Sequence, residues 1–338
     1  MHFQFVLDII VLDLNMELIK KILEKFNGLH YGQEYLCLAA EPFRDPLHGY
    51  LVDRGIVIKD ITRQHLFIGY CPLILAFSST AIASGCTEIS LAFTDKVFPP
   101  GSYVPGQHLV ASLSLRKIGQ FNTDESEIFL FEGRRGGHRF ISRFHQFIIQ
   151  LHNNWYQRKP GNVYLKGNLY KQVQIAYSVP RKISLVTVGA QGLYNHFPTD
   201  LHGQASGHYY VISLRHGGKA CTQVEQTKKI VLSDVKPGAY NKVYALGKNH
   251  MQPLKERQAF DFDTSDSVYF HLPLPKDLIA YRELELENSF HYGIHKLLLF
   301  RIRHERLIKA GAAGLCHIHN VYATWRLKKE LAGNYLLR

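Results

Sequence analysis

Residues Lys182 to Val235 read KISLVTVGAQGLYNHFPTDLHGQASGHYYVISLRHGGKACTQVEQTKKIVLSDV, and their pattern constrains the fold more than any other part of the chain. Runs rich in β-branched and aromatic residues alternate there with glycine-bearing turns. The pattern predicts, in order, a strand, a turn, a polar loop, a second strand, a second turn and a helix. The two predicted strands cover Ser184 to Gly189 and Tyr209 to Leu214.

The second turn carries chemistry that suits a phosphate group. A phosphate needs hydroxyl donors, backbone N–H groups at a turn or helix N-terminus, and a cation. Gly217 and Gly218, followed by Lys219 and Thr222, offer all of these within one short loop. Thr222 can also be the N-cap of the helix. For the Asn and Thr residues of this segment, ordinary turn and cap chemistry without any ligand is the open alternative.

The order and spacing of these features resemble the flavin reductase-like, FMN-binding split-barrel family over about residues 163–331. The shared layout is a strand ending in V-T, a glycine turn, an Asn-led polar loop, a strand ending in V-S-L and a K/R-x-x-T helix start. The resemblance implies a β-barrel that holds FMN and a homodimer with the flavin near its interface. It also implies NAD(P)H as a transient electron donor, which needs no Rossmann fingerprint because the nicotinamide stacks on the flavin.

The resemblance assigns the cofactor-binding residues position by position. Asn195 matches the residue that opens the loop facing the flavin, and Arg215 or His216 would lie at the pyrimidine edge of the ring. Asp200 departs from the family pattern, because an aspartate beside a phosphate would repel it unless Lys or Arg intervened. No catalytic residue is assigned. The full predicted set is Thr187, Asn195, Thr199, Asp200, Ser213, Arg215, His216, Lys219 and Thr222.

The rest of the chain predicts two domains of a mostly β, α+β protein. A mixed α+β domain covers residues 1–159, of which residues 1–15 precede a second candidate start at Met16, and the FMN-binding split barrel covers residues 160–338. A second, degenerate barrel in the first half is the alternative. Lys159-Pro160-Gly161 is the predicted linker. Predicted helices cover Met16 to Phe26 and Phe140 to Leu151. Further predicted strands are Tyr35 to Ala39, Gly55 to Ile58, His65 to Phe77, Glu88 to Phe93, Leu109 to Leu115, Gln172 to Tyr177, Lys229 to Leu232, Leu297 to Arg303 and Val321 to Trp325.

Two other motifs call for a choice between function and structure. The segment GRRGG (133–137) with Arg139 ahead of a helix can be a phosphate cradle, but a solvated turn is the favoured interpretation. His317 and His319 alternate on a predicted strand and, with His291 and His295, could hold a metal. No carboxylate or cysteine completes a ligand spacing, so no metal site is predicted.

Composition limits the partners and the compartment. The formal charge of +12 favours anionic partners, but the basic residues are scattered and no nucleic-acid-binding motif accompanies them, so no nucleic acid is predicted. Five cysteines without a C-x-x-C pair indicate a reducing, cytoplasmic setting. The longest apolar run, Leu66 to Phe77, is too short to cross a membrane.

Two functions therefore follow from the sequence. The first is an FMN-binding, NAD(P)H-dependent flavin reductase-like oxidoreductase. The second is a non-catalytic flavin-binding protein, or a degenerate split barrel that serves as an interaction module. The departure at Asp200 and the bulky pair Tyr209-Tyr210 keep the second function open.

Overall fold

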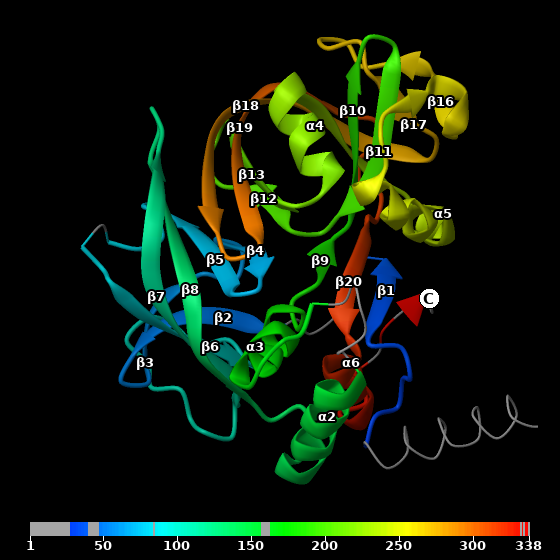
Figure 1. The fold of residues 1–338 in the computed structure, drawn as a ribbon. Coiled ribbons are helices and arrows are strands. Elements are labelled where there is room, and N and C mark those ends of the chain that lie inside the picture. The colour runs from blue at the N-terminus through cyan, green and yellow to red at the C-terminus, as the bar shows by residue number, and fades with distance from the viewer. Residues whose placement is uncertain are drawn as a thin grey trace, which may run out of the picture.

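The computed structural model describes residues 28–39, 47–83, 85–156, 163–331, 333 and 335–336. The predicted helix at Met16 to Phe26 and the predicted linker lie outside these residues. The described chain is mostly β and forms several antiparallel sheets (Figure 1). Within it, no helix has the length and apolar character needed to span a membrane. All five cysteines are free thiols.

The first half of the chain forms a seven-stranded antiparallel sheet, called here the first sheet. Its order is β3-β2-β6-β7-β8-β5-β4. Alternating apolar residues bury one face of most strands, as in β6, where Ile89, Leu91 and Phe93 are buried. The strands are β2 (His48–Asp53), β3 (Ile56–Asp60), β4 (His65–Tyr70), β5 (Leu73–Ser78), β6 (Glu88–Thr94), β7 (Leu109–Asn122) and β8 (Glu127–His138).

The second half forms an eight-stranded antiparallel sheet, the second sheet, in the order β12-β13-β19-β18-β14-β10-β11-β15. Helix α4 (Lys219–Thr227) connects β13 to β14. The strands are β10 (Ser184–Ala190), β11 (Leu193–Thr199), β12 (His202–Gln204), β13 (Tyr209–Arg215), β14 (Lys229–Val235), β15 (Lys255–Glu256), β18 (Leu278–Tyr292) and β19 (His295–Leu307). Between β14 and β18 lie η1 (Pro237–Ala239), α5 (Tyr240–Ala245), η2 (Leu246–Met251), η3 (Arg257–Ala259) and the pair β16 (Phe262–Asp266) and β17 (Pro273–Pro275).

The two large sheets share one strand topology. Read from β4, the first sheet runs β4-β5-β8-β7-β6-β2-β3; read from β12, the second runs β12-β13-β19-β18-β14-β10-β11. When only these seven strands of each half are numbered in chain order, leaving out β15, β16 and β17, both sheets have the spatial order third, fourth, seventh, sixth, fifth, first, second. The halves differ at the link from the fourth to the fifth strand, because that link contains α4 in the second half and no helix among the described residues of 79–87.

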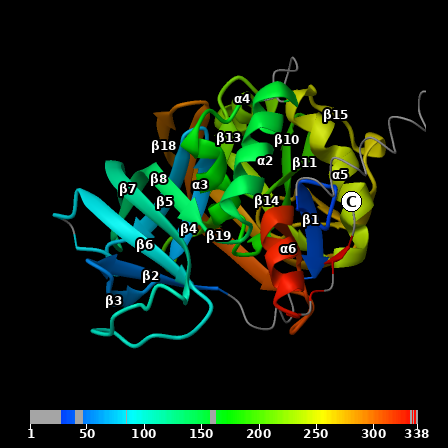
Figure 2. The same ribbon diagram turned by 90° about the horizontal axis from the view of Figure 1, so that it is seen from below.

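A small third sheet joins the halves. It has the order β21 (Tyr335–Leu336), β1 (Tyr35–Ala39), β20 (Leu315–His319) and β9 (Arg181–Lys182), so it pairs strands from both ends of the described chain. Helices α2 (Arg143–Tyr156), α3 (Asn168–Ala176) and α6 (Asn320–Lys328) lie beside it (Figures 1 and 2). The core of the first half therefore includes residues from beyond position 160, among them Val173, Ile175 and Trp325.

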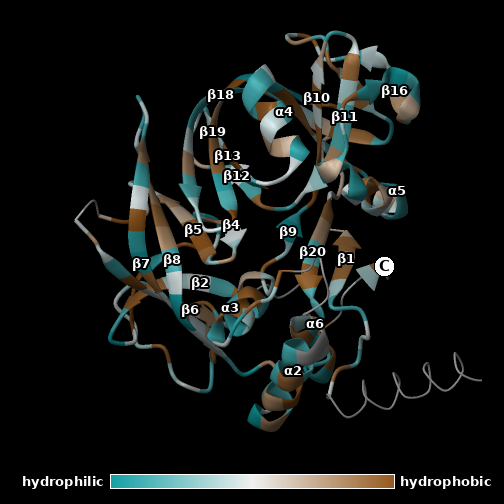
Figure 3. Ribbon diagram, in the orientation of Figure 1, coloured by the Kyte–Doolittle hydropathy of each residue, from teal (hydrophilic) through white to brown (hydrophobic). Residues whose placement is uncertain are grey.

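The two large sheets pack on each other through equivalent strands, and we call this apolar contact the seam. It contains Ile74 and Ala76 of β5 and Leu130 of β8, which meet Val211 of β13 and Leu299 of β19. Apolar residues, brown in Figure 3, recur along the strands of both sheets. Because the fourth and seventh strands contribute from each side, the halves meet as two copies of one unit would in a dimer.

Several predicted elements are wrong. Gln172 to Tyr177 and Val321 to Trp325 are helical, in α3 and α6, and β20 ends at His319, before the predicted closing strand. In α3, polar Gln172 and Gln174 alternate with apolar Val173 and Ile175 as in a strand, and in α6 nearly all side chains are buried, so no apolar stripe distinguishes it as a helix. The apolar run from His65 to Phe77 is a hairpin, with β4 and β5 separated at the cis Cys71–Pro72 bond.

The GRRGG segment and the second predicted helix also differ from expectation. Residues 133–137 are neither a turn nor a cradle but part of strand β8. Helix α2 begins at Arg143, after Phe140, and its Phe144 and Phe147 are 59% and 60% exposed instead of packing in a core.

Candidate functional site at the seam

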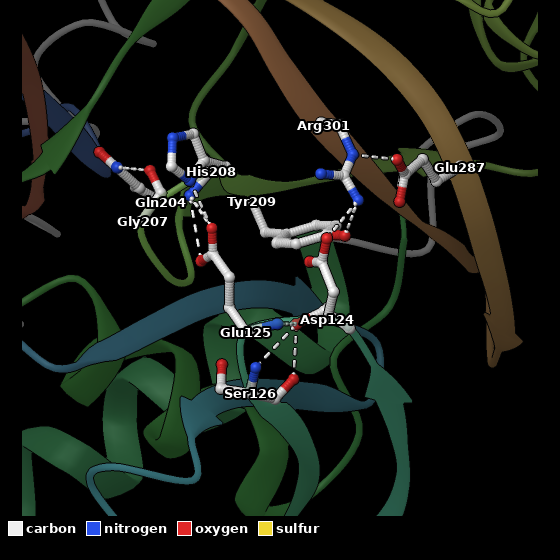
Figure 4. Close-up of polar contacts among 10 residues, drawn as sticks. Asp124, Glu125, Ser126, Gln204, Gly207, His208, Tyr209, Glu287 and Arg301 are labelled. Atoms are coloured by element: carbon white, nitrogen blue, oxygen red, sulfur yellow. Dashed lines mark hydrogen bonds and ion pairs between the residues drawn. The ribbon is translucent and has the colours of Figure 1, made fainter.

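At each end of the seam, a strand-connecting turn of one half contacts such a turn of the other half, and we call each of these two contacts a clasp. At one end, the β7–β8 turn rests on the β12–β13 turn: the backbone N–H of His208 donates to the Glu125 carboxylate at 3.1 Å, and Arg301 pairs with Asp124 at 3.0 Å (Figure 4). At the other end, the equivalent β18–β19 turn rests on the β4–β5 turn, where the N–H of Ile294 donates to the Cys71 carbonyl at 3.2 Å. The two clasps are equivalent, because in each the turn between the sixth and seventh strands of one half contacts the turn between the third and fourth strands of the other.

Tyr70 is the centre of the second clasp. The Nε atom of Arg215, at the end of β13, donates to the Tyr70 hydroxyl at 2.6 Å, and the guanidinium carbon lies 5.6 Å from the ring centroid. The backbone N–H of Tyr70 donates to Nε2 of His295 at 3.1 Å, and Nδ1 of His295 lies 3.0 Å from the Ser213 hydroxyl. One residue of the first half thus lies between three residues of the second.

The electrostatics of this clasp fix the state of His295. Burial lowers its pKa to about 4, and the positive charge of Arg215 adds to the effect. His295 is therefore neutral near pH 7. Because its Nε2 accepts from Tyr70, its Nδ1 carries the proton and donates to Ser213.

The loop beside this clasp leads into α4. Gly218 is the helix N-cap and has no side chain to cap the helix, so Thr222 is not the cap, contrary to prediction. Arg215, His216, Gly217 and Lys219 are exposed. The first N–H groups of any α-helix lack intrahelical acceptors. Two exposed cations therefore flank a helix N-terminus, which is favourable for an anion.

Asp200 lies on the other side of Tyr70, and its charge contributes to raising the pKa of that tyrosine, after burial. Its Oδ2 accepts from the Tyr177 hydroxyl and from Nδ1 of His317, both at 2.8 Å. Burial opposes its ionisation, but these hydrogen bonds and the His317 charge outweigh burial and hold the pKa of Asp200 below its usual value. The departure from the family pattern thus has a structural explanation: this carboxylate is bound within the protein.

Three predicted residues are buried in the second sheet: Thr187, where a strand was predicted, and Asn195 and Thr199, where a polar loop was predicted. Residues 193–199 form strand β11, so Asn195 and Thr199 belong to a strand, contrary to prediction. Asn195 is fully buried and donates to Gln223 at 2.7 Å and to the carbonyl of Asn249, in η2, at 3.0 Å. Thr187 is also fully buried, with its hydroxyl 3.0 Å from Nδ1 of His196.

The structure brings Ser213, Arg215, His216 and Lys219 together, and adds Tyr70 and His295, which the sequence did not assign to the site. The sequence indicated His295 only as a possible metal ligand. Tyr70 has no local signal at all, because its role depends on the packing of the first half on the second. The four histidines considered for a metal lie in two places, and no group of three or more ligating side chains that could hold a metal occurs in the described ranges.

The opposite end of the seam holds a cleft of about 380 Å³. It lies at the position equivalent to the Arg215 clasp, with Arg63 as its one Lys or Arg among the lining residues. The further polar residues that line it are Gln64, Ser78, Thr80, Glu125, Ser126, Gln204 and Ser206. The two ends are therefore related in topology but not in chemistry.

No protein-family model and no curated protein matches the chain. Among solved structures, an NADH:FAD oxidoreductase of Streptomyces globisporus C-1027 matches 48% of this chain and 96% of its own, with 13% identity and a TM-score of 0.41. The flavin reductase component of a bacterial two-component tryptophan halogenase matches 45% and 94%, with 14% identity and a TM-score of 0.39. An FMN-binding protein from Thermus thermophilus matches 38% and 71%, with 17% identity and a TM-score of 0.33. Over roughly half its length, the chain is thus similar in structure to flavin reductases and FMN-binding split-barrel proteins.

Proposed function

We propose that the chain binds a phosphate-bearing flavin of the FMN type at the Tyr70–Arg215 clasp and acts as a flavin reductase-like oxidoreductase. One observation carries the proposal: Arg215, which contacts the half-buried ring of Tyr70, and Lys219, the first residue of α4, are both exposed. A cationic helix N-terminus next to an aromatic surface suits a ligand with a phosphate at one end and a flat ring at the other.

The fit of the flavin to these residues is good at the phosphate end. Lys219, Arg215 and the N–H groups of the first turn of α4 supply cations and donors, and Thr222 adds an exposed hydroxyl one turn along. Asn195 and Thr187 do not contribute, because both are fully buried and hydrogen bonded inside the protein. The remaining contacts to the ring would come from Tyr70 and His216.

A bound flavin would supply hydride or electron transfer, with a nicotinamide as donor. The part of the protein is to hold the phosphate, to keep Arg215 fixed through Tyr70, and to keep His295 neutral. The Arg215 charge would stabilise an anionic reduced flavin, so Arg215→Ala is expected to lower the reduction potential. An unchanged potential would exclude Arg215 from the ring's surroundings.

The second candidate is a flavin-binding protein or interaction module without turnover. The hydrogen bonds of Asn195 favour it, because η2 occupies the partner positions that an open loop would offer a ligand. NADH oxidation in the presence of FMN separates the two candidates.

The test of the proposal is an absorbance spectrum of the freshly purified protein, followed by titration with FMN and measurement of its fluorescence quenching. Lys219→Gln removes a charge-assisted contact and is expected to raise the Kd about 10-fold or more. Lys228→Gln, at the other end of the same helix and also exposed, is the control and should leave the Kd unchanged. A protein that neither carries nor quenches FMN contradicts the proposal.

A further inference from the structure

A second region of the molecule has the character of a binding site and plays no part in the proposed flavin site. It is a groove of about 1480 Å³ on the first sheet, lined by β6, β7 and β8 and by residues 103–109 and 139–146. We infer that this groove binds a single strand of nucleic acid through its phosphates.

The floor of the groove consists of small side chains in register on three neighbouring strands. Ser90 of β6, Ser114 of β7 and Arg135 of β8 form one row across the sheet. Ala92, Ser112 and Gly137 form the next. An added Cβ at Gly137 would meet only the Ser112 hydroxyl, at 4.0 Å, so the floor is open above this glycine. Serine hydroxyls can donate to phosphate oxygens.

The charges of the groove have one sign. None of its lining residues is Asp or Glu, and five are Lys or Arg. No ion pair of these five side chains occurs within the described part of the chain, so their charges are available to a ligand. The five are Arg135, Arg139, Arg143, Lys171 and Lys328.

The two arginines of the GRRGG segment differ in their contacts, although the pockets that they line adjoin each other and share Val52, Ser90 and Ser114. Arg135 and Gly137 line the groove, whereas Arg134 lines a different pocket on the sheet and pairs with Glu132 at 3.3 Å. The charge of Arg134 is thus neutralised by Glu132, whereas no carboxylate pairs with Arg135 among the described residues. Because the basic residues are scattered along the sequence, no nucleic acid was predicted as a ligand. Folding gathers five of them from β8, α2, α3, α6 and the segment before α2.

The geometry favours a nucleic-acid strand over an acidic peptide. An extended peptide gains most of its affinity from backbone hydrogen bonds at a sheet edge. Here the floor strand β7 is paired on both sides, with β6 and β8, so it offers no free backbone groups. A nucleic-acid strand needs only cations along its phosphates and a surface for a base. Tyr103, which is 66% exposed on the groove, offers such a surface.

The test is fluorescence anisotropy of labelled 20-nucleotide oligo(dT) and oligo(U) with the full chain, between 50 and 200 mM salt. The double variant Arg135→Gln/Arg143→Gln is compared with Lys228→Gln/Lys248→Gln, which has the same net charge and changes two exposed residues that line neither the groove nor the pocket beside it. Each lost phosphate contact should reduce the slope of log K against log salt by about 0.7, so the groove variant should lose about 1.4 and the control nothing. Thermal unfolding curves verify that both variants fold.

Three outcomes would overturn the inference. The first is that neither oligonucleotide binds at 50 mM salt. The second is that both double variants lose the same slope, because binding would then follow net charge and not the groove. The third is that a 20-residue poly-Glu peptide displaces the oligonucleotide at equal concentration, which would assign the groove to an acidic protein partner. FMN titration of the groove variant should be unaffected in every case.

Discussion

At the residue scale, the histidines show how burial decides chemistry. Four of them, His65, His138, His196 and His295, are less than a tenth exposed, and burial lowers the pKa of each to about 4. Each has a neutral hydrogen-bond partner, for example Gln174 for His138 at 2.8 Å and the Ile61 carbonyl for His65 at 2.8 Å. The folded protein therefore holds these four rings uncharged.

This burial predicts a loss of stability in mild acid. In the unfolded chain a histidine titrates near pH 6.5, so as the pH falls from about 6.5 to 4 the unfolded state takes up protons that the folded state excludes. Stability is full above pH 6.5 and falls by about 1.4 kcal/mol per pH unit for each such histidine. We expect urea unfolding at pH 5.5 to show a free energy several kcal/mol below that at pH 7.5.

The contribution of one ring can be isolated. His138→Gln should make the pH dependence shallower by about 1.4 kcal/mol per unit in this window. His271→Asn, at an exposed position with positive φ that asparagine tolerates, is the control and should leave the slope unchanged. Unfolding free energies that do not vary between pH 7.5 and 5.5 would contradict the assignment of neutral buried rings.

At the element scale, β8 packs against α3 at Gly136 and also lines the groove, to which α3 contributes Lys171. An added Cβ at Gly136 would lie 2.9 Å from Cγ of Gln172 and 3.1 Å from Cδ1 of Ile175, both in α3. The helix therefore packs directly against the strand backbone. Asn168 reinforces the contact, since the N–H of Gly136 donates to its Oδ1 at 2.6 Å.

This close approach predicts opposite outcomes for two neighbouring glycines. Gly136→Ala should destabilise the protein by about 1–3 kcal/mol, because the α3 side chains must shift to admit a methyl group. Gly137→Ala meets open space and should be neutral within about 0.5 kcal/mol. Chemical denaturation of the two variants measures the difference; equal losses would mean that strand propensity and not helix packing governs both sites.

At the scale of the whole molecule, the seam joins the two halves of one chain, whereas the resemblance predicts an interface between two chains of a homodimer. Equivalent strands of the two sheets already cover each other, and each half donates a turn to the other. The predicted homodimer remains a prediction, but this face is not available to it. We therefore expect light scattering to give one chain of 38.8 kDa. A mass of twice that value would show that the protein associates through another surface.

The sequence alone predicted much of the second half. Residues 184–189, 209–214 and 229–232 are strands because their apolar side chains alternate around turn glycines, and the helix after Gly218 follows. Local patterns failed where polar side chains are buried: Gln172 and Gln174 make part of α3 alternate like a strand, and α6 contacts protein on nearly all sides, so no polar face distinguishes it as a helix. Strand β8 was missed because its glycines are typical of a turn. The structure explains Gly133 and Gly136 differently, since α3 packs directly against the strand backbone there.

The tertiary structure decided the site and its surroundings. Ser213, Arg215, His216 and Lys219 are close in sequence, so local chemistry was enough to group them. Tyr70 joins them only because the first sheet packs on the second, and Asn195 is excluded because Gln223 of α4 and Asn249 of η2 accept its hydrogen bonds. The sequence determined which side chains can bind an anion; tertiary contacts, between residues 145 positions apart for Tyr70 and Arg215 and 54 apart for Asn195 and Asn249, determined which of them are free to do so.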